Sequence, residues 1–181
     1  LADESWREPV ENYCSPARLE AELEKVLRPL PVAFCPSTAL AEAGSFITRT
    51  VAGVPLLVIR GGDGIVRAFR NVCRHRGMAL ASGSGCARSL VCPYHGWVYR
   101  LDGGLRHVPG EEGYPDLDKS TRGLSPVEAE ERRGVVFVTL EGSAGDALDG
   151  LPDLLGDGPA LLRTEELVLG VNWKLFTETF L

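Results

Sequence analysis

Two short cysteine and histidine pairs limit what this chain can fold into more than any other feature. Cys73 and His75 stand in "CRH" with only Arg74 between them, and Cys92 and His95 stand in "CPYH". Thiolate and imidazole are the ligands expected for zinc or iron. Two loops that each supply one cysteine and one histidine must lie close together in space to close around a metal. The pattern therefore predicts a fold that brings these two loops together.

The ligand types leave two kinds of metal centre open. A structural zinc site would place all four side chains on one ion, whereas a Rieske 2Fe–2S cluster takes two Cys on one iron and two His on the other. Zinc spacings usually leave two to four residues between paired ligands, so the single residue between Cys73 and His75 favours the cluster. Gly77 and Gly96 follow the histidines, where the backbone must approach the centre closely.

Length and charge exclude several classes of protein. The 181 residues fit one domain plus part of a second. A net charge of -6, from 19 Lys and Arg against 25 Asp and Glu, argues against a nucleic-acid partner. No apolar run approaches the ~20 residues of a membrane span, and the start lacks the features of a signal peptide. We therefore expect a cytoplasmic protein without membrane contact, and five cysteines are an odd number for a disulfide framework.

The order of hydrophobic patterns predicts a mainly β, antiparallel fold. Residues 13–30 have helical spacing, with Ser15 as the cap and Pro16 in the first turn. Glycine-rich turns at 61–64 and 102–104 separate segments rich in β-branched and aromatic residues. The expected strands are 45–51, 54–60, 65–72, 97–100, 105–108, 133–140 and 165–171. The charged run 128–133 reads as a solvated surface.

The two loop sequences, "CRHRG" and "CPYHGW", resemble the Rieske domain of the terminal oxygenase component of ring-hydroxylating and related Rieske non-haem iron oxygenases. The resemblance covers nearly the whole chain. It implies that Cys73 and Cys92 bind one iron of a 2Fe–2S cluster and that His75 and His95 bind the other. The residues expected to surround the cluster are Arg76, Gly77, Met78, Tyr94, Gly96, Trp97 and Tyr99.

The end of the chain adds a second resemblance. The segment "NWKLFTETF", after Val171, is similar to the opening of that family's catalytic domain, in which two His and one carboxylate hold a mononuclear Fe(II). The chain has three histidines, so His107 alone remains after the cluster is assigned. We therefore expect no catalytic residue here and mononuclear iron only in a catalytic domain beyond this sequence. The expected domains are a lead-in with a helix (1–43), a Rieske domain of stacked small sheets (44–142), and a linker with the start of a catalytic domain (143–181).

These resemblances imply a role in electron transfer. The domain would pass electrons from a ferredoxin or flavin reductase to the mononuclear iron of an oxygenase, for dioxygen-dependent hydroxylation or demethylation, in a trimer or hexamer. The sequence leaves the substrate open, because aromatic dihydroxylation, monooxygenation and oxidative demethylation are all compatible with it; aromatic hydrocarbon catabolism is the setting that the resemblance suggests. Arg74 and Arg76 are candidates for docking an acidic electron donor, with a structural role equally open.

Three alternatives are weighed. A free-standing Rieske ferredoxin would need neither the first helix nor the segment after residue 142. A respiratory Rieske protein would carry an extra cysteine in each loop, where Met78 and Tyr94 stand. A structural zinc module is the third. The remaining cysteines, Cys14, Cys35 and Cys86, are expected to be ordinary thiols.

Overall fold

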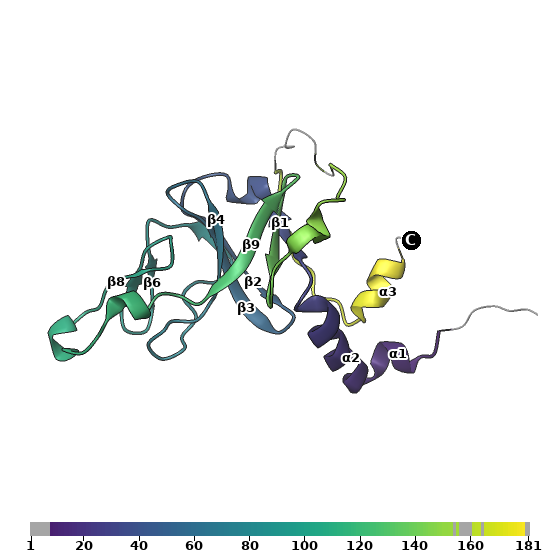
Figure 1. Cartoon of the computed structure of the whole chain (residues 1–181), viewed down its shortest axis with the longest axis horizontal. Helices are drawn as coiled ribbons and strands as arrows, with labels where there is room; N and C mark the ends of the chain where they lie inside the picture. Colours follow the sequence, from purple (N-terminus) through teal and green to yellow (C-terminus); the bar gives the residue numbers. More distant parts are fainter. Residues whose placement is uncertain (1–7, 154, 156–160, 164, 180–181) are drawn as a thin grey trace, which may run out of the picture.

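The computed structural model describes residues 8–153, 155, 161–163 and 165–179, and most of its regular structure is antiparallel β-strand (Figure 1). The strands are β1 (Val32–Pro36), β2 (Ser45–Val51), β3 (Val54–Arg60), β4 (Val66–Arg70), β5 (Ser84–Cys86), β6 (Leu90–Val91), β7 (Val98–Tyr99), β8 (Leu105–His107), β9 (Pro126–Arg132) and β10 (Val135–Thr139). The helices are α1 (Glu11–Cys14), α2 (Pro16–Glu22), a π-helical turn (Leu23–Leu27) and α3 (Trp173–Glu178). Short 3₁₀ turns cover Ser37–Leu40, Glu111–Gly113, Lys119–Thr121 and Gly145–Leu148.

The strands form two sheets. A seven-stranded sheet has the order β1-β10-β9-β4-β3-β2-β5, and a three-stranded sheet has the order β6-β7-β8. In Figure 1 the small sheet lies at one end of the molecule and the three α-helices lie at the other. The predicted fold class, antiparallel β with stacked small sheets and an N-terminal helix, is confirmed.

Strand β3 is buried on both faces, which explains its almost unbroken apolar sequence. Leu57 and Ile59 point into the core shared with the small sheet, and Leu56 and Val58 point into the core on the opposite face. The first of these cores also contains Cys73, Cys92, Trp97 and Tyr99. One face of the large sheet therefore packs against the buried side of the candidate metal centre.

The N-terminal helix begins where the sequence predicts, because the Ser15 side chain accepts a hydrogen bond from the Arg18 backbone and Pro16 occupies the first turn. Its buried Glu22 accepts hydrogen bonds from Trp173 Nε1 (3.0 Å) and Lys174 Nζ (2.7 Å) at the start of α3. Two segments far apart in sequence are thus tied together. After Val171, Trp173, Phe176 and Phe180 have the spacing that suits the start of a helix, and this helix is confirmed as α3; Phe180 itself lies outside the described residues.

One prediction of regular structure was wrong. Residues 165–171 form no strand, and Leu167 and Val168 are 77% and 95% exposed, so no described strand covers their apolar side chains. The charged run 128–133 was expected only as solvated surface; most of it belongs to β9, and none of its side chains is buried. Glu131 in this strand is paired with Arg60 of β3 at 2.8 Å, which satisfies its charge within the sheet.

Strand β1 was not expected, and it comes from the segment assigned to the lead-in. It pairs with β10 at the edge of the large sheet, with Val32 opposite Val138. The domain boundary at residue 44 remains a prediction. Among the described residues, no helix has the length and apolar character needed to cross a membrane.

Candidate metal centre

The first candidate loop, residues 73–78, is closed by its own backbone. Cys73 N donates to Met78 O at 2.8 Å, and Gly77 N donates to Cys73 O at 3.0 Å. Gly77 has a φ of +75°, a conformation that side chains other than glycine rarely adopt. The turn folds the chain back on itself, with Cys73 buried at its base and His75 within its span.

The second loop, residues 92–97, repeats this pattern. Cys92 N donates to Trp97 O at 2.8 Å, and Gly96 N donates to Cys92 O at 3.0 Å. Gly96 also has a positive φ, +69°, and a Cβ added there would lie 3.1 Å from Pro109 Cγ. The two loops therefore present a cysteine at the same backbone position, in each case on the buried side.

The two histidine rings lie next to each other. The ring centroids of His75 and His95 are 4.6 Å apart in an edge-to-face arrangement. Trp97 stacks flat on His75 at 4.9 Å, and Tyr94 lies against His95 at 3.8 Å. Trp97 is only 4% exposed, whereas Tyr94 is 58% exposed. Trp97 thus lies on the buried side of the His75 ring, whereas Tyr94 covers the His95 ring from the solvent side.

The two thiols also lie together, in the core beneath the rings. Cys73 and Cys92 are 2% and 3% exposed. Burial raises the pKa of the Cys73 thiol, and the neighbouring Cys92 adds to this rise. Without a positive metal nearby, the raised pKa keeps the Cys73 thiol protonated. A metal would favour the thiolate that binds it.

Tyr99 braces the cysteine side of the centre. Its hydroxyl lies 3.3 Å from Cys73 Sγ and accepts a hydrogen bond from Arg74 N at 3.0 Å. The side chain is fully buried, and burial together with Cys73 raises the pKa of its hydroxyl. Because the Arg74 amide already donates to the oxygen, the hydroxyl proton is free to point at the sulfur.

The histidine side contains the feature that fits a bound metal most directly. Among the described residues, His75 Nδ1 is one of two buried side-chain polar atoms without a hydrogen-bond partner. A buried ring nitrogen without a partner is costly unless something else binds it. Burial, and then His95 and Arg76, lower the pKa of His75, so its ring is held in the neutral form that a metal requires.

The arrangement of the four side chains also bears on the choice between zinc and a cluster. Nowhere in the described part of the chain do three His, Cys, Asp or Glu side chains converge on a point that could hold one metal ion. A tetrahedral zinc site needs such convergence, whereas a 2Fe–2S cluster takes its ligands in pairs at two irons. The two thiols lie beside each other and so do the two imidazole rings, which suits a cluster in which one iron takes two Cys and the other takes two His.

Comparison with known families agrees with this geometry. The profile of the Rieske [2Fe–2S] domain matches residues 31–120, a range that contains both loops. The chain belongs to the Rieske [2Fe–2S] domain family. Its cofactor is accordingly a 2Fe–2S cluster, and the match begins at residue 31, just before β1.

The relatives of this Rieske domain are oxygenase subunits. The carnitine monooxygenase oxygenase subunit of Escherichia coli (strain K12) is 38% identical over 152 residues, which are 83% of this chain and 41% of that protein. The crystal structure of a quaternary ammonium Rieske monooxygenase in complex with an inhibitor is similar, with a TM-score of 0.76 and 36% identity over 82% of this chain and 42% of that one. A naphthalene 1,2-dioxygenase structure gives a TM-score of 0.68 and 31% identity over 72% of this chain and 30% of that one. The chain thus spans less than half the length of each of these proteins.

The other residues predicted around the cluster occupy different places in the Rieske domain. Arg76 and Met78 are exposed at the outer side of the first loop, and Met78 contributes its backbone carbonyl to closing the loop. His107, expected to be a strand-surface residue rather than a ligand, is an exposed residue of β8. Cys35 is a buried thiol whose pKa burial raises to about 11, which fits the expectation that it is unreactive.

One residue that positions the first loop was missed. Asn71 is 6% exposed, its Nδ2 donates to Ala81 O at 2.8 Å, and its Oδ1 accepts from Leu80 N at 3.0 Å and Ala81 N at 3.3 Å. These bonds join the chain just before the first loop to the chain just after it. The only signal in the sequence was a polar side chain directly after a buried strand, which by itself is typical of any turn.

Proposed function

We propose that Cys73 and Cys92 bind one iron of the 2Fe–2S cluster and that His75 and His95 bind the other. The single observation that carries this assignment is the pairing of two buried thiols and two adjacent rings by loops of equal backbone geometry. The partnerless Nδ1 of His75 adds support from the histidine side. When bound, such a cluster accepts and returns one electron, so the domain would act as an electron relay.

The surrounding residues would hold the ligands in place and keep water from the buried side. Gly77 and Gly96 let each loop turn back on itself, Trp97 fixes the plane of the His75 ring, and Tyr99 supports the Cys73 sulfur. The His rings are less deeply buried than the thiols. Electrons would therefore leave the cluster most directly through His75 or His95, toward the mononuclear iron.

The whole protein would be a Rieske oxygenase, a role supported by the relatives of this domain. Electrons would come from a ferredoxin or flavin reductase and go to a mononuclear iron in a catalytic domain of the same or a neighbouring subunit of an oligomer. We propose oxidation of a quaternary ammonium compound rather than of an aromatic hydrocarbon, because identity to the carnitine enzyme is 38% and to the naphthalene enzyme 31%. None of these relatives is a free-standing ferredoxin, so that alternative gains no support.

The ligand assignment is tested by metal and sulfide analysis of the purified chain. We expect two irons and two acid-labile sulfides per chain, with the visible absorption and electron paramagnetic resonance spectrum of a Rieske centre. Cys92→Ser should abolish all of these signals. His107→Ala is the matched control, because it removes the third histidine from an exposed position on β8 and should leave the signals unchanged. One zinc and no sulfide in the unsubstituted chain would refute the proposal.

The substrate class is tested on the oxygenase that contains this domain, supplied with a reductase and dioxygen. We expect substrate-dependent oxygen consumption with L-carnitine and none with naphthalene. The reverse result would return the substrate class to the aromatic hydrocarbons.

A further inference from the structure

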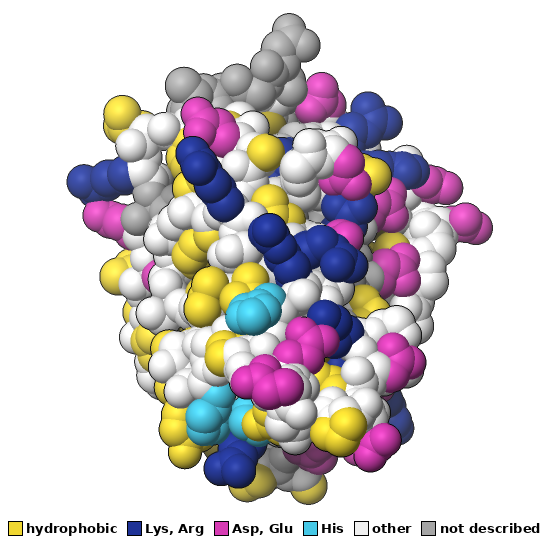
Figure 2. Space-filling view, turned by 90° about the vertical axis from the view of Figure 1, so that its left-hand side faces the viewer, with side chains coloured by type: hydrophobic (Ala, Val, Ile, Leu, Met, Phe, Trp, Pro, Cys, Tyr) yellow, Lys and Arg dark blue, Asp and Glu magenta, His cyan; other side chains and the backbone are white. Residues whose placement is uncertain are grey.

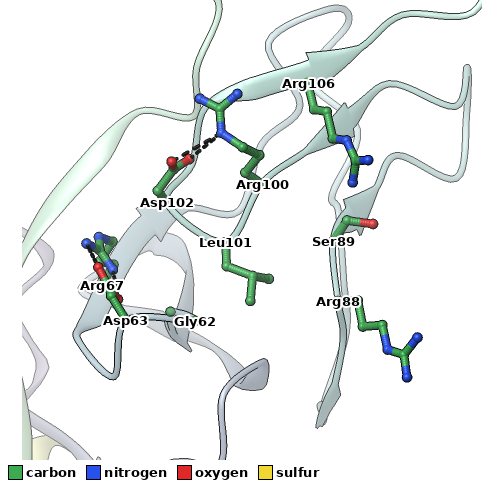
Figure 3. Close-up of a pocket in the computed structure, with 10 residues that line it drawn as sticks. Gly62, Asp63, Arg67, Arg88, Ser89, Arg100, Leu101, Asp102 and Arg106 are labelled. Atoms are coloured by element: carbon green, nitrogen blue, oxygen red, sulfur yellow. Dashed lines mark hydrogen bonds and ion pairs between the residues drawn. The ribbon is translucent and has the colours of Figure 1, made fainter.

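Four arginines line a hollow beside the small sheet, and we call them the arginine face: Arg67, Arg88, Arg100 and Arg106. The hollow has a volume of about 350 Å³, and its remaining lining includes Asp63, Asp102 and Ser89 (Figure 3). Neither cluster loop contributes to it. The arginine face is therefore a feature separate from the metal centre.

The charges of this face are only half compensated. Arg67 pairs with Asp63 at 2.6 Å, and Arg100 pairs with Asp102 at 3.1 Å. Within the described residues, neither Arg88 nor Arg106 has an ion-pair partner, although the whole chain has a net charge of -6. Figure 2 views the molecule from the end that carries the small sheet, and several Lys and Arg side chains lie close together near the middle of that face. A local positive surface on an acidic protein attracts acidic partners to one place.

The arginine face lies close to the metal centre along the small sheet. Arg100 directly follows Tyr99, whose hydroxyl contacts Cys73 Sγ at 3.3 Å. Arg88 precedes Cys92 by four residues through β6, a distance of roughly 13 Å in an extended chain. A partner that covers this face would therefore lie within a short distance of the buried cysteines.

A β-bulge sets the direction of Arg106. Val98 pairs with His107 and Tyr99 pairs with Leu105, so Arg106 is the extra residue of β8 between these two pairs. Bulges redirect a side chain and are common beside functional sites. In Figure 3 the Arg106 side chain points along the hollow toward Ser89.

The spacing of the guanidinium groups indicates the kind of partner. In Figure 3 Arg88 and Arg100 point away from each other, and the four groups spread over the rim instead of converging on one point. A single phosphate would need convergent donors, whereas separated arginines suit several carboxylates on an extended surface. Resting on the proposed electron-transfer function, we propose that the arginine face docks an acidic electron-donor protein, with Arg88 and Arg106 as its main contacts.

The test measures docking directly, with a purified acidic plant-type 2Fe–2S ferredoxin as the probe. Its affinity for the cluster-loaded chain is measured by calorimetry at low salt, with both proteins oxidised so that no turnover is involved. We expect Arg106→Glu to weaken binding about 10-fold and Arg88→Glu with Arg106→Glu to weaken it about 100-fold, and high salt should reduce both differences. Lys25→Glu is the matched control, because it makes the same change of charge at an exposed position of the π-helical turn and should change affinity less than 2-fold.

The outcomes separate this inference from the proposed function. Equal weakening by Arg106→Glu and Lys25→Glu would overturn the inference, since overall charge would then explain the effect. Weakening by Arg76→Glu with no effect at Arg88 and Arg106 would also overturn it and place docking on the first loop. Self-association of the chain that is lost on reversal of Arg88 and Arg106, with ferredoxin affinity unchanged, would replace the donor with a second copy. In each case photoreduced free flavin should still reduce the cluster; failure of that control would refute the electron-relay function itself.

Discussion

The two cluster loops have the same backbone hydrogen bonds but are held in place by different means. The second loop, residues 92–97, closes a hairpin, because Leu90 pairs with Tyr99 and Val91 with Val98. The first loop, residues 73–78, follows β4 and leads into a segment without such pairing until β5. There Asn71 joins the two ends of the loop through its side chain. Equal geometry thus arises once from strand pairing and once from a single buried amide.

The largest expected effect comes from removing that amide. Asn71→Ala leaves backbone groups of Leu80 and Ala81 without partners, at about 1–3 kcal/mol for each group that stays buried. We expect a loss of about 2–4 kcal/mol in stability and a cluster content well below one per chain. Iron and sulfide analysis after purification, together with thermal loss of the visible absorption, measures both.

Asn172→Ala is the matched control for this prediction. Asn172 also bonds backbone groups with its side chain, accepting from Lys174 N at 3.0 Å and donating to Tyr13 O at 2.8 Å, but it does so at the start of α3. Its replacement should loosen α3 and leave the cluster content unchanged. Equal cluster loss in both variants would mean that Asn71 contributes only to general stability.

Gly77 and Gly96 occupy equivalent positions in the two loops, so substituting each of them compares the two loops directly. Gly77→Ala and Gly96→Ala both force alanine into a positive φ, at about 1–2 kcal/mol. A Cβ at Gly77 meets nothing within 4 Å, whereas at Gly96 it lies 3.1 Å from Pro109 Cγ. We therefore expect Gly96→Ala to cost about 1 kcal/mol more, because the proline ring must move. Thermal bleaching of the cluster measures the difference. Equal bleaching temperatures in the two variants would show that the Pro109 ring moves aside without a cost in stability.

The same contrast explains how much of the molecule could be predicted from the sequence. Strands β2 and β3 were predicted with their observed bounds, because their apolar patterns and glycine-rich turns act locally. The four candidate ligands were found from residue type and spacing, and their pairing on two irons was implied by the resemblance of the two loops to the Rieske family. The role of Asn71 was not, since it depends on residues 80–81 folding back beside it, which no local pattern encodes.

The strands that the sequence did not predict also depend on contacts between residues far apart in the chain. Strand β1 forms because β10 offers a partner edge, and β9 accepts charged residues because Arg60 pairs with Glu131. The segment 165–171 has strand propensity but no neighbouring strand in the described chain, so it forms no strand and stays exposed. Pairing partners distant in sequence decided each case, against the local propensity.

The smallest expected effect is on the reduction potential and concerns the bond between the loops. Tyr99 follows the second loop in β7, and its hydroxyl contacts the Cys73 sulfur of the first loop. Because Arg74 N already donates a hydrogen bond to the hydroxyl oxygen, the hydroxyl proton can point at the sulfur. A donor to a cluster sulfur stabilises the reduced state, which carries more negative charge. Rieske potentials cover roughly -150 to +300 mV, and Met78 and Tyr94 stand where cysteines would brace a high-potential cluster, so we expect a midpoint of about -150 to 0 mV. Tyr99→Phe removes a hydrogen bond of about 1 kcal/mol and should lower the midpoint by roughly 40 mV, while Tyr94→Phe, on the exposed side, should shift it little. Protein-film voltammetry decides, and a midpoint raised by Tyr99→Phe would mean that the hydroxyl does not donate to the sulfur.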